Sequence, residues 1–293
     1  MAQEDRPVWL VVNSASGRYS EDSVAGVYAA LAAADRKPAR VMDCKYGAFP
    51  DRAALEQEDI ATLAIFGGDG TSRSCLKGVE GWGGAALVLP GGTTNLLARA
   101  IFGGLALDDI VAGFGRGELA VTRRPCLRWS TGSPERAGRE YALALTEVLA
   151  GPGARWGDVR EDLREGAVAA MVTESVDITQ ESLTGGQVRV ADPQIGRESG
   201  YPGLRLVPGA EGIRINGYHM DNLAEWFSQG LAIVRRNFRE GPHDALGSAM
   251  EVLCRSTDGD RIELLVDGER RSAGNQVRFS LDSFDLNLLG PPA

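Results

Sequence analysis

A short segment at residues 66–71 combines glycines with an acid and a hydroxyl. Phe66-Gly67-Gly68-Asp69-Gly70-Thr71 ends an apolar run and precedes a stretch with a helical pattern. Glycines let backbone N–H groups approach a phosphate without obstruction by Cβ, and a helix N-terminus favours anions. A carboxylate repels phosphate, so Asp69 suits Mg²⁺ binding, ribose binding or acceptance of a proton from an attacking hydroxyl. The alternative is a glycine-rich turn in which Asp69 only caps the helix.

Two further loops repeat this combination of glycine, hydroxyl and amide. One is Asn13-Ser14-Ala15-Ser16-Gly17, and the other is Leu89-Pro90-Gly91-Gly92-Thr93-Thr94-Asn95. In the second loop, Thr94 or Asn95 as a plain helix N-cap is the alternative. Because parallel strands present their carboxyl ends at one edge of a sheet, we expect all three loops to converge on one crevice.

The elements that must position these loops alternate over the first 120 residues. Apolar runs predict strands at 8–12, 40–42, 62–66 and 85–89, and helical patterns fall at 24–31, 52–58 and 95–101. Short uninterrupted apolar strands separated by helices indicate a parallel sheet covered on both faces.

From about residue 121 the pattern changes to alternation of apolar and polar residues. This alternation predicts half-buried, mostly antiparallel strands, at 187–190, 204–206, 213–215, 261–264 and 276–281. Helical stripes interrupt them near 156–171 and 221–238. We therefore predict an α/β domain at 1–120 and a β-sandwich-like domain with a few helices at 121–293, with the extreme C-terminus a candidate to pack back on the first domain.

Composition and charge narrow the class of protein. The chain has 38 glycines in 293 residues, and its 43% hydrophobic content favours a globular protein over a flexible linker. A net charge of −9 disfavours nucleic-acid binding, which depends on neutralising phosphates. The N-terminus lacks a signal-peptide pattern, and the four cysteines stand far apart, which favours free thiols in a reducing cytosol.

The three loops together resemble the diacylglycerol kinase catalytic-domain family, which includes bacterial lipid kinases and sphingosine kinases. The matching segments are Asn13–Gly17, Gly67–Thr71, Pro90–Asn95 and, late in the chain, Asp267-Gly268-Glu269. This resemblance implies a Rossmann-like first domain, similar to NAD kinase and phosphofructokinase, followed by a β-sandwich.

The activity implied by the resemblance is ATP-dependent phosphorylation of a lipid hydroxyl, with diacylglycerol as the default substrate and ATP and Mg²⁺ as cofactors. Asp69 and Glu269 would be catalytic, with Asp69 near the phosphates and Mg²⁺ and Glu269 as general base. The nucleotide would be held by Asn13, Ser16, Gly17, Gly67, Gly68, Asp69, Gly70, Thr71, Gly92, Thr93 and Asn95. The metal ligands stay open. We expect a cytoplasmic, peripherally membrane-associated enzyme that meets its lipid at the bilayer surface and binds no nucleic acid; a homodimer is left open.

Other interpretations rest on particular residues. Asp267-Gly268 between two strands predicts a β-hairpin, in which Glu269 has a structural place whatever its chemistry. Ser72-Arg73-Ser74 stands where the family commonly has x-Asn-Glu, and Leu96 stands where many relatives have Asp. These departures motivate an alternative, a catalytically impaired nucleotide- or lipid-binding regulator. A NAD kinase is a further alternative, since that family shares the Gly-Gly-Asp-Gly-Thr loop but not the third-loop match.

Overall fold

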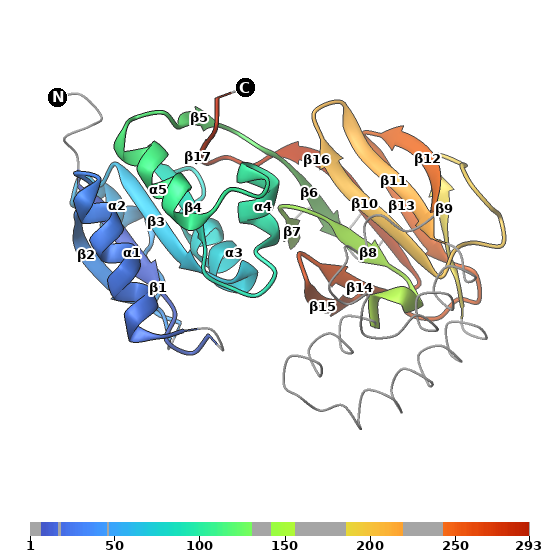
Figure 1. Ribbon diagram of the computed structural model, residues 1–293. Coiled ribbons are helices and arrows are strands. Elements are labelled where there is room, and N and C mark those ends of the chain that lie inside the picture. The colour runs from blue at the N-terminus through green and yellow to red at the C-terminus, as the bar shows by residue number, and fades with distance from the viewer. Residues whose placement is uncertain are drawn as a thin grey trace. The chain divides into compact units, whose positions relative to one another are not determined.

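The computed structural model describes residues 7–16, 19–45, 47–130, 142–155, 186–218 and 243–292 (Figure 1). The chain divides into two compact units. One comprises Met1–Arg124 with Ser283–Ala293, and the other comprises Pro125–Asp282. Within the described ranges, no helix is both long and apolar enough to cross a bilayer.

The first unit is built on a six-stranded sheet with the order β2-β1-β3-β4-β17-β5. Its strands are β1 (Val8–Val12), β2 (Pro38–Asp43), β3 (Thr62–Gly67), β4 (Ala85–Pro90), β5 (Ala120–Thr122) and β17 (Asn287–Gly290). Strands β2, β1, β3, β4 and β17 run parallel, and β5 pairs antiparallel with β17. Every residue of β1 is buried, as its uninterrupted apolar run predicts for a strand covered on both faces.

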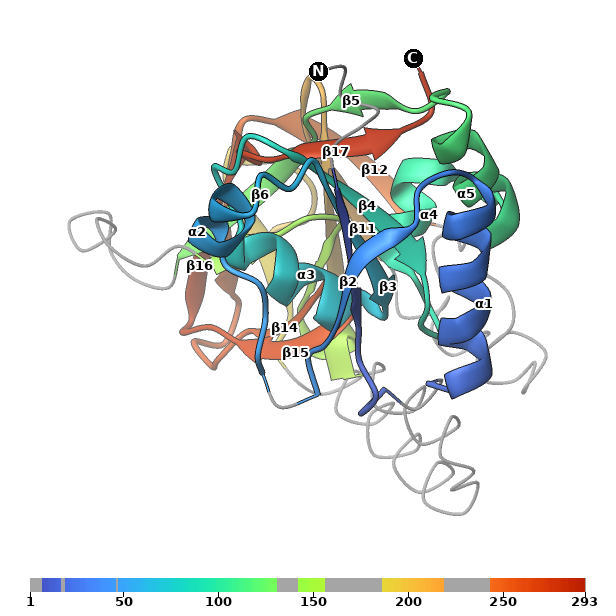
Figure 2. The ribbon, with the colours of Figure 1, turned by 90° about the vertical axis from the view of Figure 1, so that its left-hand side faces the viewer.

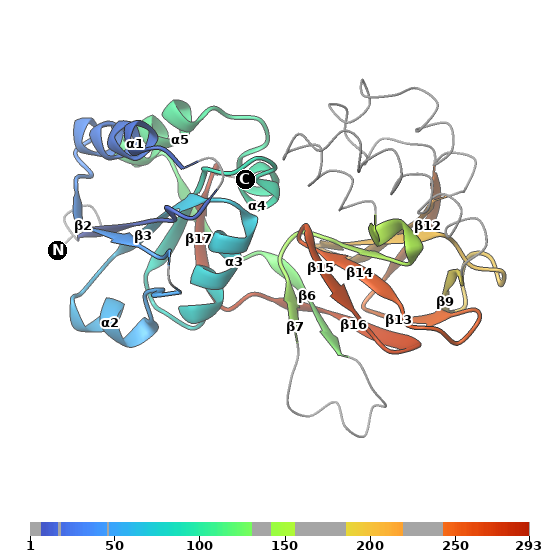
Figure 3. The ribbon, with the colours of Figure 1, turned by 90° about the horizontal axis from the view of Figure 1, so that it is seen from below.

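Helices cover both faces of this sheet, with α1 and α5 on one face and α2 and α3 on the other (Figures 2 and 3). Their bounds are α1 (Glu21–Ala33), α2 (Arg52–Gln57), α3 (Asp69–Gly78), α4 (Leu96–Phe102) and α5 (Leu107–Gly115). Side-chain caps fix two of the starts: Ser20 accepts from the Ser23 N–H and Asp51 accepts from the Ala54 N–H. Helix α5 carries two acids in its first turn and was not predicted.

The C-terminal strand β17 lies between β4 and β5. Asn287 and Leu288 pair with Ala85 and Ala86 of β4, and Leu288 is fully buried. The last strand of the chain therefore completes the sheet that the first residues begin, although the whole second unit separates them in sequence.

The second unit contains two antiparallel sheets, a six-stranded one with the order β12-β11-β10-β8-β14-β15 and a five-stranded one with the order β7-β6-β16-β13-β9. The strand bounds are β6 (Pro125–Ser130), β7 (Ala142–Ala144), β8 (Val148–Ala150), β9 (Val188–Asp192), β10 (Gly203–Gly209), β11 (Gly212–Tyr218), β12 (His243–Ala249), β13 (Glu251–Ser256), β14 (Glu263–Val266), β15 (Glu269–Ser272) and β16 (Gln276–Ser283). A short 3-10 helix, η3 (Pro152–Arg155), follows β8.

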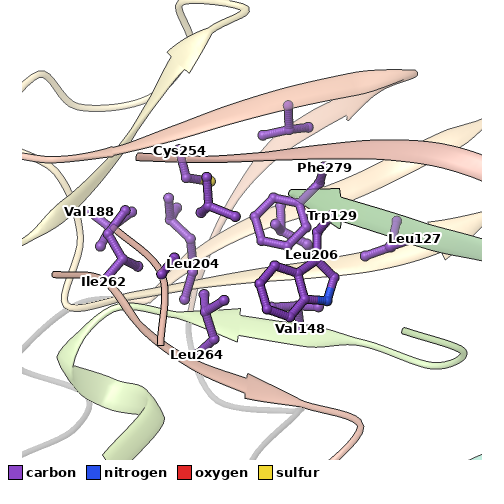
Figure 4. Packing of buried hydrophobic residues seen from close by; sticks show 14 of the residues in the cluster. Leu127, Trp129, Val148, Val188, Leu204, Leu206, Cys254, Ile262, Leu264 and Phe279 are labelled. Atoms are coloured by element: carbon purple, nitrogen blue, oxygen red, sulfur yellow. The ribbon is translucent and has the colours of Figure 1, made fainter. Parts of the chain in front are cut away.

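One hydrophobic cluster draws residues from both of these sheets (Figure 4). Leu204 and Leu206 come from the six-stranded sheet, and Cys254 and Phe279 come from the five-stranded sheet. The predicted fold class is therefore confirmed: an α/β unit with a mainly parallel sheet, and a second unit of antiparallel sheets. The helices predicted near 156–171 and 221–238 lie outside the described residues.

Replacing Phe279 by alanine is expected to lower the free energy of unfolding by about 3–5 kcal/mol, because this fully buried ring lies in the core and leaves a cavity. Met250→Ala, at a side chain that is 60% exposed, is the control and should change stability by less than about 0.5 kcal/mol. Urea unfolding followed by fluorescence measures both, and equal effects would contradict this assignment of the core.

Candidate active site

The loop from β3 to α3 presents a helix N-terminus that no side chain caps. Strand β3 ends at Gly67, helix α3 begins at Asp69, and Gly68 between them is the N-cap residue. Gly68 has no side chain to accept from the first N–H groups, and α3 has no side-chain cap bond. Helix N-termini carry partial positive charge, so this start of α3 is suited to an anion such as phosphate.

The loop after β4 lies against the loop after β3, backbone to backbone. The Gly91 N–H donates to the carbonyl of Gly67 at 3.2 Å. A Cβ added to Gly91 would lie 2.6 Å from the nitrogen of Gly67, and one added to Gly92 would lie 2.5 Å from the Cα of Gly68. These approaches are far below ordinary contact, so glycine is required on this side of the contact.

The side chain of Asn95 stabilises the conformation of the loop after β4 through hydrogen bonds within that loop. Its side-chain oxygen accepts from the Gly92 N–H at 2.7 Å, and its side-chain nitrogen donates to the Gly92 carbonyl at 2.8 Å. Asn95 has a φ of +51°, the left-handed conformation that asparagine tolerates, and its side chain makes no cap bond to α4. Asn95 therefore occupies the N-cap position of α4, as the alternative interpretation held, but its side chain shapes the loop and does not cap the helix. Thr93 is exposed on this loop.

Asp69 connects the starts of two helices. It is the first residue of α3, and its Oδ1 accepts from the N–H of Leu97 in the first turn of α4 at 3.1 Å. Asp69 therefore acts as a helix cap, the alternative interpretation, but for α4, whose Leu97 lies 28 positions later in the sequence. This bond places the carboxylate beside both helix N-termini, where an acid is electrostatically favoured.

The loop after β1 joins the same group of residues. The side-chain amide of Asn13 donates to the hydroxyl of Thr71 at 2.9 Å, and its oxygen accepts from the Ala15 N–H at 3.0 Å. The Ser16 N–H closes the turn on the Asn13 carbonyl at 3.1 Å. The three predicted loops therefore converge, as expected for strand ends at one edge of a sheet. Gly17 lies outside the described residues.

Asp43, at the end of β2, supports this first loop and was not predicted. Its Oδ1 accepts from the backbone N–H groups of Ser14 and Lys45, each at 3.0 Å. Hydrogen bonds from Ser14, followed by the N–H and charge of Lys45, hold the pKa of Asp43 below its usual value. No sequence signal marked it, because the residue lies in a separate strand whose neighbour is known only from the sheet order.

These loops offer backbone N–H groups, hydroxyls, amides and one carboxylate, and this set fits a nucleotide phosphate chain. Among the residues that the structure describes, no three or more His, Cys, Asp or Glu side chains come together as a metal site. Mg²⁺ is usually bound by one or two carboxylates together with substrate phosphates and waters, so Asp69 is the residue here that fits a nucleotide-bound Mg²⁺.

The late Asp-Gly-Glu segment forms the predicted hairpin. Val266 at the end of β14 pairs with Glu269 at the start of β15, and Asp267 and Gly268 turn with φ of +49° and +85°. The Glu269 side chain is 33% exposed and forms an ion pair with Arg271, Oε2 to Nη2, at 2.8 Å. The structure thus places Glu269 beside a tight turn in the second unit.

Asp267 is buried, with 5% of its surface exposed, and it receives four hydrogen bonds. The donors are the N–H groups of Leu145, Thr146 and Glu147 and the Thr146 hydroxyl, at 2.6–3.2 Å. Burial raises the pKa of Asp267, and the bonds from Thr146 and the neighbouring N–H groups oppose that rise. This carboxylate therefore fixes the turn of the hairpin to the loop between β7 and β8.

A family model matches most of the N-terminal segment of the first unit. Residues 7–119 match the family model of the diacylglycerol kinase catalytic domain. This match confirms, over residues 7–119, the resemblance predicted from the motifs.

Solved structures of bacterial proteins share the fold over nearly the whole chain. A diacylglycerol kinase from Bacillus anthracis str. Sterne has a TM-score of 0.59 at 13% identity, covering 98% of this chain and 97% of the other. A putative diacylglycerol kinase from the same organism has a TM-score of 0.61 at 14% identity, covering 98% of both. At these identities the likeness concerns the fold. No curated protein sequence matches the chain.

Replacing Gly92 by alanine is expected to destabilise the first unit by roughly 1–3 kcal/mol, because its Cβ would meet the backbone of Gly68. The matched control is Gly83→Ala, where a Cβ meets nothing within 4 Å. Thermal unfolding of both variants measures the difference. Equal melting temperatures for Gly92→Ala and Gly83→Ala would refute the close contact of the two loops.

Replacing Asp267 by asparagine is expected to lower the free energy of unfolding by about 2–3 kcal/mol, because buried donors lose a charged acceptor. Asparagine tolerates the left-handed turn, so the substitution isolates the hydrogen bonds from backbone strain. The control is Asp260→Asn, at an exposed position in the same unit. Urea unfolding measures the free energy of unfolding of both variants, which should fall only for Asp267→Asn. An Asp267→Asn variant as stable as the unaltered protein would contradict the role of this carboxylate.

Proposed function

We propose that the protein is an ATP-dependent lipid kinase that transfers the γ-phosphoryl group of ATP to a lipid hydroxyl. The observation that carries the proposal is the contact among the three motif loops, through Asn13 with Thr71, Gly67 with Gly91, and Asp69 with Leu97. The match of residues 7–119 to the kinase catalytic domain supports it independently of this geometry.

The first step in the proposal is nucleotide binding at the three loops. The phosphates would lie at the start of α3, where Gly68 leaves the helix uncapped by a side chain. Hydroxyl and amide groups around this start suit the remaining polar atoms of the nucleotide. The residues assigned to nucleotide binding are Asn13, Ser16, Gly17, Gly67, Gly68, Asp69, Gly70, Thr71, Gly92, Thr93 and Asn95.

Asp69 would hold the Mg²⁺ that accompanies the nucleotide. Mg²⁺ supplies neutralisation of the charge on the β- and γ-phosphate oxygens. The bond from the Leu97 N–H fixes the orientation of the Asp69 carboxylate, because one of its oxygens is held at the start of α4. An acid positioned in this way needs little rearrangement when the nucleotide binds.

In the transfer step, the lipid hydroxyl oxygen forms a bond to the γ-phosphorus while the bond from the γ-phosphorus to the bridging oxygen breaks and ADP leaves. Glu269 would accept the hydroxyl proton, and its pairing with Val266 fixes its backbone beside the tight hairpin turn. Phosphoryl transfer depends mainly on positioning and charge neutralisation, so the reaction needs no further acid–base residue from the protein.

Diacylglycerol is the default substrate, and a sphingoid base or ceramide is the other class of acceptor. We infer that the protein meets the lipid at the bilayer surface by peripheral association. Purified protein incubated with [γ-³²P]ATP, Mg²⁺ and each lipid in mixed micelles should label one of them, and chelation of Mg²⁺ by EDTA should abolish the labelling. If ATP binds and no lipid is labelled, the kinase proposal is overturned.

The variant Glu269→Gln is expected to lower the labelling rate about 10²–10⁴-fold, the usual contribution of a positioned general base. Asp69→Asn is expected to lower the rate as well, because Mg²⁺ would lose its carboxylate ligand. Asparagine keeps an oxygen that can accept from the Leu97 N–H, so Asp69→Asn should lose activity while its melting temperature falls only by the small amount that the lost charge at two helix N-termini contributes. Glu263→Gln, in the partner strand of the hairpin, is the control and should stay active. Full activity of Asp69→Asn would contradict its proposed role.

A second candidate is a nucleotide- or lipid-binding regulator without turnover, favoured by Ser72-Arg73-Ser74 and Leu96 in place of the polar and acidic residues of the family pattern. It predicts thermal stabilisation by ATP with no labelled lipid. A NAD kinase would instead form NADP from NAD and ATP. Labelled lipid, ATP binding without labelled lipid, and NADP formation therefore distinguish the three functions, and all can be measured with one protein preparation and ATP.

A further inference from the structure

Helix α3 has a buried face and an outer face. Its buried residues are Thr71, Ser72, Cys75 and Leu76. Its remaining central positions form the outer stripe, which comprises Gly70, Arg73, Ser74 and Lys77. At 3.6 residues per turn these four positions lie on one face of the helix, because the other three follow Gly70 by three, four and seven residues. The outer stripe therefore begins at the uncapped end of the helix and carries two cations.

Arg73 is the cation of the stripe that lies within reach of this end. Side chains of a helix point toward its N-terminus and cover the turn before their own Cα. Arg73 is four residues beyond Asp69, or about 6 Å along the axis at 1.5 Å per residue. Gly70, which lies on that path one turn earlier, has no side chain to obstruct it.

The chemistry of Arg73 suits a phosphate at this place. Its guanidinium is planar and always charged, and it binds phosphate oxygens in pairs. Arg73 is half-buried, whereas Lys77, one turn further from the helix start, is exposed. Asp69 brings negative charge to the same first turn, so a bound phosphate needs a nearby cation.

We propose that Arg73 contacts the phosphate groups of the bound nucleotide and so contributes affinity that depends on those phosphates. The inference rests on the proposed function, because it concerns the same nucleotide site. It assigns a role to the residue at which this chain departs from the family pattern, where asparagine is common. Arg73 would then take over, in part, the role of the asparagine and glutamate that are common at these positions in the family pattern, where this chain has Arg73 and Ser74.

The test compares Arg73→Ala and Arg73→Asn with Lys77→Ala, a matched control that removes a cation from the same stripe. Isothermal titration calorimetry measures the affinities of the full-length proteins for ATP, ADP and adenosine. Loss of charged hydrogen bonds is expected to raise the Kd for ATP and ADP about 10–100-fold in both Arg73 variants. Adenosine, which has no phosphate, should bind all variants equally, and Lys77→Ala should stay within about twofold for ATP because its charge is distant and screened.

The outcomes separate this inference from the proposal on which it rests. If the unaltered protein binds neither ATP nor ADP, the proposed function fails. If it binds them and both Arg73 variants bind equally well, the function stands and the role of Arg73 is refuted. A loss of adenosine affinity in the same proportion also refutes it, since that result indicates a general distortion of the site. The melting temperatures of the nucleotide-free variants verify folding.

Discussion

The backbone contact of Gly67 and Gly68 with Gly91 and Gly92 constrains the arrangement of the first unit. Strands β3 and β4 pair from Thr62 with Ala85 up to Gly67 with Pro90, so their two loops leave the sheet at adjacent points. Without Cβ atoms the loops touch, and the starts of α3 and α4 lie close enough for Asp69 to accept from Leu97. The polar groups of the candidate site have their positions because this contact is possible.

The second unit uses a comparable device with a buried carboxylate in place of glycines. Asp267 joins the β14–β15 turn to the loop between β7 and β8, and the Asp267 N–H also donates to the Glu147 carbonyl at 3.0 Å. Glu147 in turn forms a partly buried ion pair with Arg205 of β10, Oε2 to Nη2, at 2.7 Å. Three neighbouring strands of one sheet thus hold the turn that precedes Glu269, which gives that residue a fixed backbone whatever its chemistry.

The parallel strands could be predicted from the sequence, because strands buried on both faces consist of uninterrupted apolar residues. The convergence of their loops could be predicted as well, because the carboxyl ends of parallel strands lie at the same edge of a sheet. The sequence could not supply the partners of Asp69 and Asp267. The Leu97 N–H and the N–H groups of 145–147 are backbone donors with no signature in residue type, and they lie 28 and about 120 positions away. Strand β12 was missed because none of its residues is fully buried, which weakens the alternation on which prediction depends.

The electrostatics of Asp69 connects the architecture to the proposed chemistry. A carboxylate beside phosphates is repelled, and a fold that keeps one there must stabilise it by other means. Here an N–H at the start of α4 donates to the Asp69 carboxylate, and Asp69 itself lies in the first turn of α3. Two helix N-termini therefore stabilise the negative charge of Asp69. That stabilisation is present before any nucleotide binds. The remaining repulsion toward phosphates must then be offset by cations, and the proposed bound Mg²⁺ and Arg73 would supply part of that positive charge.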